Sequence, residues 1–169
     1  IIMSNLPSNF EEAIKNAKRL SNKILIDGKL ISPSTDNKIK VINPSTGENI
    51  GEAPQCDKND VDHAVKSSLN AFKEWKKIPA RERGRLVELG ARNLEERKGE
   101  IETLLSLDTG NALRTQAKPE TAASIELTRM FAGLSGEIKG ENYPPNIANT
   151  LHFTTRDPIG VVCAIVPWN

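Results

Sequence analysis

Apolar residues recur at three- and four-residue intervals through the central part of the chain, and this spacing predicts amphipathic helices. The clearest case runs from Val61 to Trp75. Asp57 is a favourable N-cap for this helix, and the carboxylate of Asp60 suits its first turn. Pro79 limits the helix, because the residue before a proline is biased away from the helical conformation.

Three further helices are expected after this one. Pro79 suits the first turn of a helix that continues to about Arg97. Gly99 is expected to mark a break, and the next helix stops near Gly110. Pro119 opens the third helix. Its apolar face comprises Ala123, Leu127, Met130, Phe131 and Leu134, and Gly133, Gly136 and Gly140 end it.

Two segments before these helices predict short strands. Lys23–Ile31 has the pattern of a β-hairpin, and Asp27-Gly28 suits its tight turn because glycine tolerates a positive φ. Lys38–Ile42 predicts another short strand, followed by a stretch dense in turn-forming residues. The chain therefore begins its ordered part with small β elements and continues with helices.

The last thirty residues change character. Asn149–Arg156 alternates between two faces, which is typical of a strand. Gly160–Val166 is a continuous apolar run, the pattern of a strand buried on both faces of a parallel sheet that helices cover. Asn169 follows almost directly on this run, which leads us to expect a truncated domain.

Composition and charge exclude several classes of protein. The 169 residues are 37% hydrophobic and 27% charged, and no stretch approaches the roughly 20 apolar residues of a membrane helix. The formal net charge of +1 gives no electrostatic reason to expect nucleic acid or a membrane surface as a partner. Two cysteines are too few for a disulfide framework, so a reduced, cytoplasmic setting is expected.

The candidate nucleophiles and histidines are unconvincing on their own. Cys163 lies inside the apolar run, where burial would raise the pKa of its thiol and leave it inert. Cys56 has no histidine near it in the sequence. His63 and His152 are isolated and are expected to be surface residues. The charged stretch Arg81–Arg97 is expected to be the solvated face of a helix, with ion pairs such as Glu82–Arg85.

The closing segment Arg156–Asn169 resembles the R-x-P-x-G-V-V-x-x-I-x-P-W-N segment of the aldehyde dehydrogenase superfamily. Upstream segments resemble the same family in the same order, and together they cover about residues 23 to 169. Two positions depart from the pattern: Asn111 stands where lysine is usual after Thr-Gly, and Cys163 where glycine or alanine is commoner. The upstream matches are Ile42–Glu48, Val61–Trp75, Leu107–Gly110 and Phe131–Gly136.

The resemblance implies an α/β fold: the N-terminal part of a cofactor-binding domain, built of helices and short strands, with an incomplete parallel sheet and a β arm for oligomerisation. We expect residues 1–22 to be an N-terminal extension, a short surface helix or a frayed arm. Residues 23–141 and 158–169 would form the partial NAD(P)-binding domain. Residues 142–157 would form part of the oligomerisation arm, so the parent protein is expected to be a homodimer or homotetramer.

In this family a cysteine thiolate attacks an aldehyde, hydride passes to NAD or NADP, and water hydrolyses the thioester. The resemblance implies that Asn169 is the side-chain donor of the oxyanion hole; the alternative is a loop residue after a strand. Ile165, Val166, Pro167 and Trp168 would line the cofactor crevice; the alternative is plain core packing.

The resemblance also implies a monovalent-cation site at the carbonyl of Ile42 and at Asp108, although a hydrogen-bonded aspartate at a helix end explains Asp108 equally well. The family's nucleophilic cysteine, its general-base glutamate and its glycine-rich turn are not among the 169 residues. The chain alone is therefore expected to be inactive and prone to association. The choice of aldehyde, and of NAD or NADP, stays open.

Two rival interpretations remain. The first is a non-catalytic oligomerisation or interaction module derived from the family, which would use the arm and the helices to bind a full-length relative. The second is a helical binding protein unrelated to the family. The second interpretation requires the run Val161–Val166 to be exposed or helical, which its β-branched content opposes.

Overall fold

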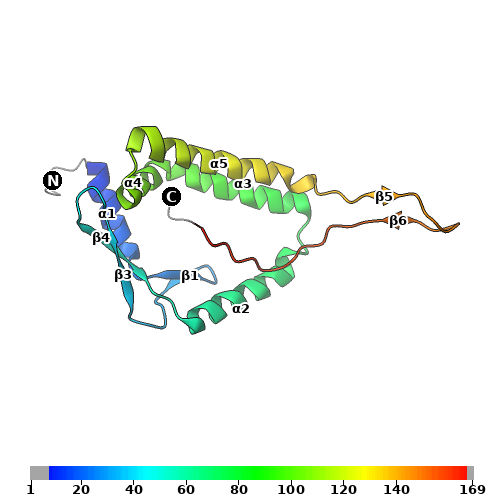
Figure 1. Ribbon diagram of the computed structural model, residues 1–169, viewed down its shortest axis with the longest axis horizontal. Coiled ribbons are helices and arrows are strands. Elements are labelled where there is room, and N and C mark those ends of the chain that lie inside the picture. Colours follow the sequence, from blue (N-terminus) through cyan, green and yellow to red (C-terminus); the bar gives the residue numbers. More distant parts are fainter. Residues whose placement is uncertain (1–7, 167–169) are drawn as a thin grey trace.

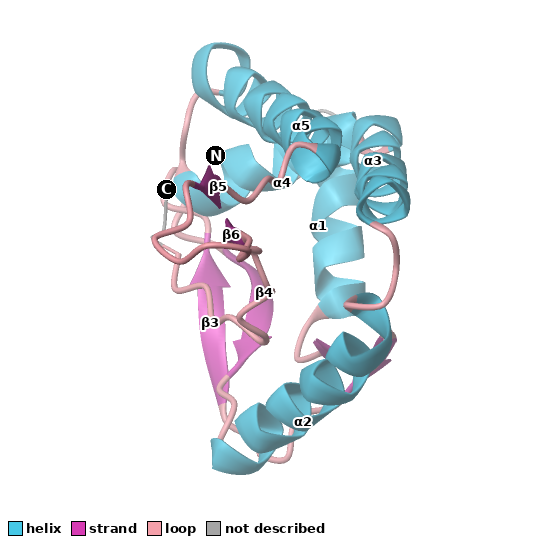
Figure 2. Ribbon diagram, turned by 90° about the vertical axis from the view of Figure 1, so that its right-hand side faces the viewer, coloured by secondary structure: helices cyan, strands magenta, loops and turns pink. Residues whose placement is uncertain are grey.

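The computed structural model describes residues 8–166. Two long helices, α3 and α5, lie side by side, and α2 lies apart from them (Figures 1 and 2). The α-helices are α1 (Ser8–Leu20), α2 (Lys58–Trp75), α3 (Ala80–Glu96), α4 (Lys98–Thr109) and α5 (Lys118–Gly133). A π-helical turn, Leu113–Ala117, precedes α5, and a 3-10 turn, Leu134–Gly136, follows it.

Within the described range, the strands pair only as separate antiparallel hairpins: β1 with β2, β3 with β4, and β5 with β6. The tight turn predicted at Asp27-Gly28 is present with positive φ at Gly28, and Asp27 also has positive φ, which was not predicted. The strand predicted at Lys38–Ile42 is present and pairs with β4, which the sequence reasoning did not anticipate. The strands are β1 (Ile24–Ile26), β2 (Lys29–Ile31), β3 (Lys38–Ile42), β4 (Asn49–Pro54), β5 (Asn142–Tyr143) and β6 (His152–Phe153).

The main hydrophobic cluster, called the nucleus below, joins α1, α4 and the β3–β4 hairpin. Its buried members are Ala13 and Ile14 of α1, Ile50 of β4 and Leu107 of α4. The helix expected within residues 1–22 is therefore present, but it is not a frayed arm. Its inner face supplies half of these buried residues, because an amphipathic helix is stabilised by burying its apolar stripe.

Helices α3 and α5 form the second packed unit. They approach closely at Gly84, where an added Cβ would lie 2.5 Å from the carbonyl oxygen of Ala132. The face of α5 that packs is not the predicted one: Thr121, Ile125 and Ala132 are buried, whereas Phe131 is 63% exposed. Small and β-branched side chains permit the close approach to α3. The larger predicted residues Leu127, Met130, Phe131 and Leu134 therefore stay outside.

The helix boundaries follow local signals closely. Pro79 precedes α3, and α5 has its proline at the first turn. The break between α3 and α4 falls at Arg97, whose backbone leaves the helical region. Gly99, the predicted break, lies instead inside the first turn of α4. Gly110 ends α4 in the left-handed conformation with φ 77°, as its residue type predicts.

The apolar run at 160–166 is not a strand in the structure, which corrects the prediction of a buried parallel strand. Residues 161–166 are exposed, with Ile165 at 94% and Val166 at 78%. A parallel strand needs neighbouring strands and covering helices. In the described part of the chain every strand is already paired within a hairpin, so the run has no parallel neighbour.

The β5–β6 hairpin projects away from the helices as a long, thin arm (Figure 1). Asn142 pairs with Phe153, and Tyr143 pairs with His152. Only these two residue pairs are regular, so the strand expected over Asn149–Arg156 is much shorter than its alternating pattern suggests. No helix among the described residues combines the length and the apolar character needed to cross a bilayer.

Candidate functional site

The residues that the resemblance assigns to the cofactor crevice and the oxyanion hole lie at the end of the chain. Pro167, Trp168 and Asn169 lie outside the described residues. Ile165 and Val166 are described, and their side chains face solvent. The structure therefore presents two of the five assigned residues as an exposed apolar surface.

The beginning of the same run rests against α2. Gly160 and Val161 border a shallow cavity of about 620 Å³ together with Phe72 and Trp75 at the end of that helix and Ile78 just after it. Figure 1 shows the chain passing α2 at this point before it continues toward its C-terminal end. The contact covers one side of Gly160–Val162 only, which leaves Val162 largely exposed.

Two turns that carry the family resemblance meet in space. The Asn43–Gly47 turn follows β3; the side chain of buried Asn43 accepts a hydrogen bond from the backbone N–H of Ser45 at 2.9 Å. Gly110 follows α4, and an added Cβ there would lie 2.8 Å from Cγ of Pro44. The segments 42–48 and 107–110 are thus packed against each other although sixty residues separate them.

The two residues considered for a monovalent cation lie near the ends of β3 and α4. Ile42 ends β3 at an irregularity in its pairing with β4, and Asp108 is exposed in the last turn of α4. Val41 and Asp108 border one cavity of about 460 Å³, whose walls are mostly apolar. Among residues 8–166, no group of three or more His, Cys, Asp or Glu side chains lies close enough together to hold a metal ion; a site made of the Ile42 carbonyl and one aspartate is of another kind and stays a prediction.

Both cysteines are exposed. The prediction that Cys163 is buried in a strand is therefore wrong, because the run that contains it is uncovered. Slight burial, and then the carboxylates of Asp60 and Asp57, raise the pKa of the Cys56 thiol. A raised pKa disfavours the thiolate, so Cys56 is poorly suited to act as a nucleophile. His63 and His152 are exposed, as predicted.

A hydrogen-bonded cluster fixes the N-terminus of α2. The Asp57 side chain accepts from the backbone N–H groups of Asn59 and Asp60, and Asp60 accepts from the backbone N–H of Asp57, which completes a capping box. The Ser34 hydroxyl lies 2.6 Å from Asp57 Oδ1, and the Ser34 N–H donates to Asp60 at 2.8 Å. The hydrogen bond from Ser34, followed by those from the helix backbone, lowers the pKa of Asp57.

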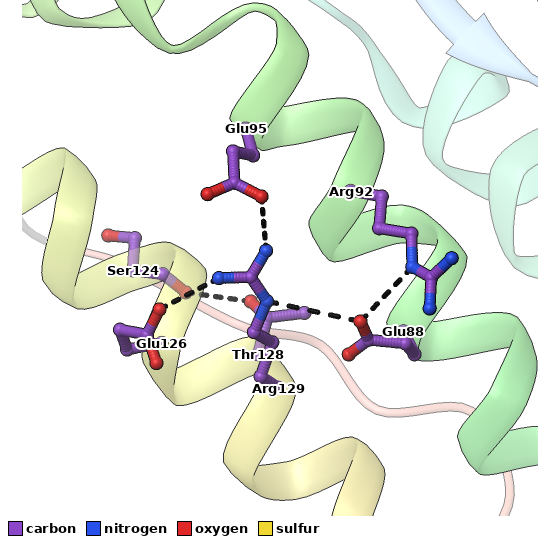
Figure 3. Close-up of polar contacts among 7 residues, drawn as sticks. All are labelled: Glu88, Arg92, Glu95, Ser124, Glu126, Thr128 and Arg129. Carbon is purple, nitrogen blue, oxygen red and sulfur yellow. Dashed lines mark hydrogen bonds and ion pairs between the residues drawn. The ribbon is translucent and has the colours of Figure 1, made fainter.

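A second polar cluster, missed in the sequence, links α3 to α5 (Figure 3). The Arg129 guanidinium of α5 pairs with Glu95 and more distantly, at 3.9 Å, with Glu88, both on α3. It also pairs at 2.8 Å with Glu126 on its own helix. The hydrogen bonds that the guanidinium donates to Glu95 and then to Glu126 raise the pKa of Arg129. The seven-residue spacing of Glu88 and Glu95 places both on one helix face, which was the available signal.

The predicted Glu82–Arg85 pair is also present, with a nitrogen–oxygen distance of 2.6 Å. Both side chains are largely exposed, and they belong to one helix rather than linking two. The stretch 81–97 is therefore largely a solvated helix face, as predicted, apart from the buried small residues Gly84, which lies against Ala132 of α5, and Ala91.

Comparison with known proteins places the sequence among dehydrogenases. Residues 31–169 match the model of the Aldehyde dehydrogenase family. The chain is 34% identical over 161 residues to an aldehyde dehydrogenase of Enchytraeus buchholzi, covering 94% of this chain and 32% of the relative. It is 34% identical over 166 residues to Retinaldehyde dehydrogenase 3 of Rattus norvegicus, covering 96% and 32%. The chain thus spans about a third of the length of these relatives.

The fold gives the same result. A betaine aldehyde dehydrogenase double mutant from Staphylococcus aureus, solved in complex with NAD+, superposes with a TM-score of 0.87 at 28% identity, covering 95% of this chain and 32% of that one. An NADP dependent enzyme of E. coli superposes with a TM-score of 0.84 at 26% identity, covering 89% and 31%. These matches exclude an unrelated helical binding protein, even though the run Val161–Val166 is exposed. In sequence and in fold, the chain belongs to the aldehyde dehydrogenase family.

Proposed function

We propose that this chain supplies the amino-terminal third of an NAD(P)-dependent aldehyde dehydrogenase, which oxidises an aldehyde to a carboxylic acid through a cysteine thioester. The observation that carries the proposal is the family match over residues 31–169, which includes the closing Pro167-Trp168-Asn169. The nucleophile is not among these 169 residues, so we expect the chain alone not to reduce NAD(P)+ in the presence of an aldehyde.

The role proposed for Asn169 follows from its chemistry. An amide N–H donates a hydrogen bond to the negative charge that develops on the aldehyde oxygen when a thiolate attacks the carbonyl carbon. An amide does not titrate, so this donor is available at every working pH. Loss of one such donor raises the barrier by about 2.7–4 kcal/mol.

The cofactor, when bound, accepts the hydride that leaves the former aldehyde carbon. The residues present fit part of such a site: Ile165 and Val166 offer an exposed apolar wall, as an aromatic cofactor ring requires. The 169 residues contain no glycine-rich phosphate-binding motif, so we propose no role for them in holding the phosphates of the cofactor. Relatives solved with NAD+ support this assignment, and a preference between NAD and NADP is not proposed.

The β5–β6 arm is proposed to pair with a neighbouring subunit in a homodimer or homotetramer. Its support is its shape: the arm leaves the helices, and Tyr143, Ile147, Leu151 and Phe153 are exposed along it. A protruding strand with unpaired backbone groups must find a partner or promote aggregation. A cytoplasmic location is part of the same proposal.

The direct test is a chimera in which this chain replaces the matching first third of the Enchytraeus buchholzi relative. We expect aldehyde-dependent formation of NAD(P)H by the chimera and none by the 169-residue chain. Asn169→Ala should lower kcat by roughly 10²–10³-fold, whereas Asn93→Ala, on an exposed position of α3, should leave it unchanged. Activity of the chain alone, or an unaffected Asn169→Ala chimera, would contradict the proposal.

One observation favours the second candidate, an interaction module: the large apolar side chains at the end of α5 and just after it are exposed together with the arm. They are Leu127, Met130, Phe131 and Leu134. Such a module would bind a full-length relative without contributing to chemistry. Stable capture of the relative by the 169-residue chain, combined with an inactive chimera, would support the module over the enzyme fragment.

A further inference from the structure

The two strands of the arm are joined at its base by contacts that extend their pairing. Strands β5 and β6 themselves form only two regular residue pairs. Next to them, in the same register, the backbone N–H of Thr154 donates a hydrogen bond to the carbonyl of Glu141 at 2.8 Å. We call the facing segments 139–141 and 154–156 the arm base. The arm base therefore continues the hairpin toward the helices.

The ladder is distorted at this point. Two facing residues of a regular antiparallel ladder exchange both N–H···O=C hydrogen bonds. Here the N–H of Glu141 donates instead to the hydroxyl of Thr154, at 2.9 Å. The carbonyl of Thr154 lies against Gly140: a Cβ added to Gly140 would overlap the carbonyl oxygen and lie 2.8 Å from the carbonyl carbon. Both atoms belong to the backbone, so neither can rotate aside as the end of a side chain could.

The remaining contacts of the arm are too few to keep it ordered without this base. A two-stranded ribbon is marginally stable in water at best. The large side chains of the arm are exposed, so packing contributes little to its order. A local irregularity in a ladder also bends the strand and redirects the residues that follow. The order and the direction of the arm therefore depend on its base.

We propose that Gly140 and Thr154 are positioning residues for assembly: they hold the arm in one ordered conformation before it meets a neighbouring subunit. The inference rests on the assembly role proposed above for the arm. A segment that is ordered before association loses less conformational freedom when it binds. The two residues can thus raise the affinity between subunits through the arm, without contacting the neighbour themselves.

Both residues lie apart from the packed units of the chain. Gly140 and Thr154 are exposed, and neither belongs to the nucleus or to the contact between α3 and α5. Their substitution should therefore leave the helices folded. This separates a change in the arm from a loss of global stability.

The first experiment measures the position of the arm in the 169-residue chain itself. In a Cys56→Ala, Cys163→Ala background, spin labels are attached at Ile147→Cys, between β5 and β6, and at Asn93→Cys on α3. Double electron–electron resonance should give one narrow distance distribution. Gly140→Ala should shift or broaden this distribution, because the new Cβ displaces the Thr154 backbone.

A matched control uses the same change seven residues earlier. A Cβ added to Gly133, the last residue of α5, meets nothing within 4 Å. Gly133→Ala should therefore leave the label distance unchanged. Far-UV circular dichroism and thermal melting of both variants should match those of the unsubstituted chain, because the helices are not touched.

The hydroxyl of Thr154 is tested separately. Thr154→Val keeps the β-branched shape and removes the acceptor for the Glu141 N–H, so it should broaden the distance distribution less than Gly140→Ala does. Thr154→Ser keeps the hydroxyl and should restore the narrow distribution. A broad distribution in Thr154→Ser as well would deny the hydroxyl this role.

The second experiment measures assembly in the chimera with the Enchytraeus buchholzi relative, by sedimentation velocity over a range of concentrations. Gly140→Ala should raise the dissociation constant between subunits by about tenfold, because the arm must then become ordered during association. Gly133→Ala should leave this constant unchanged.

Two outcomes would overturn the inference. One is the same label distance in Gly140→Ala as in Gly133→Ala. The other is an arm that is displaced by Gly140→Ala in a chimera that assembles with unchanged affinity. A monomeric unsubstituted chimera would instead contradict the assembly role proposed for the arm, whereas the label distances would still show whether Gly140 holds it.

Discussion

The nucleus and the α2 side of the molecule carry similar apolar patterns and use them differently. In the nucleus, Ala13, Ile14, Ile50 and Leu107 are buried against one another. On α2, the predicted apolar face is largely exposed to solvent. The only buried residue of this helix is Asp60, which is polar. Apolar spacing therefore identifies an amphipathic helix and its apolar face. What covers that face depends on elements that the pattern does not contain.

The largest effect that separates the two regions should come from truncating one leucine in each. Leu107→Ala removes a side chain that is 3% exposed and should lower the free energy of unfolding by about 2–5 kcal/mol. Leu69→Ala, at a half-exposed position of α2, should change it by about 0.5 kcal/mol. Urea titration of both variants measures the difference. Equal losses would mean that α2 is covered in solution.

The contact between α3 and α5 gives the next largest effect. Gly84→Ala should destabilise by about 1–3 kcal/mol, because the new Cβ meets the Ala132 carbonyl and Ser135 and forces the helices apart. Gly90→Ala is the matched control on the same helix, with nothing within 4 Å of the added atom. It should stabilise by roughly 0.5–1 kcal/mol through helix propensity alone. Thermal unfolding of both variants compares packed and open faces of a single helix.

A change at the N-cap of α2 shows whether polar contacts, rather than apolar ones, stabilise this exposed helix. The pKa of Asp57 is lower in the fold than its ordinary value of 3.8. The ionised carboxylate therefore stabilises the folded state fully above pH 3.8, and this stabilisation is lost as the pH falls through the lowered pKa. Asp57→Asn keeps a capping acceptor but does not titrate. We expect the wild type to lose melting temperature more steeply below pH 3.8 than this variant does. Parallel pH profiles of the two proteins would contradict the assignment.

The smallest effect concerns ion pairs. Arg129→Ala breaks contacts that join two helices, whereas Arg85→Ala breaks one pair within a helix. We expect the melting temperature to fall further in Arg129→Ala than in Arg85→Ala. The loss from Arg85→Ala should shrink further at high salt, because exposed pairs are screened. Melting curves at low and high ionic strength make the comparison, and an equal loss in both variants would deny Arg129 a linking role.

Local structure was predictable from the sequence to a considerable extent. The N-cap Asp57, the Asp27-Gly28 turn and the helix end at Gly110 depend on neighbours along the chain, and each was anticipated; the reciprocal hydrogen bond from the Asp57 N–H to Asp60 was not. Strand β4 was missed because its Gly51 and Pro54 weaken the strand signal.

Long-range placement was less predictable. The packed face of α5 depends on how closely Gly84 lets α3 approach, which the spacing on α5 alone does not reveal. The run at 160–166 has the composition of a central strand, yet composition does not supply the adjacent strands. For the candidate site, no local pattern identified Asn169 as a hydrogen-bond donor. That assignment rests on the resemblance alone, which is why it stands as a proposal.

The meeting of Pro44 with Gly110 has a consequence for how this family can vary. A side chain at Gly110 would require both a left-handed backbone and the removal of the Pro44 ring 2.8 Å away. A substitution at Gly110 alone should therefore be selected against, whereas Pro44 can change without creating this clash. Relatives that carry a side chain at the position of Gly110 should accordingly carry a smaller residue than proline at the position of Pro44.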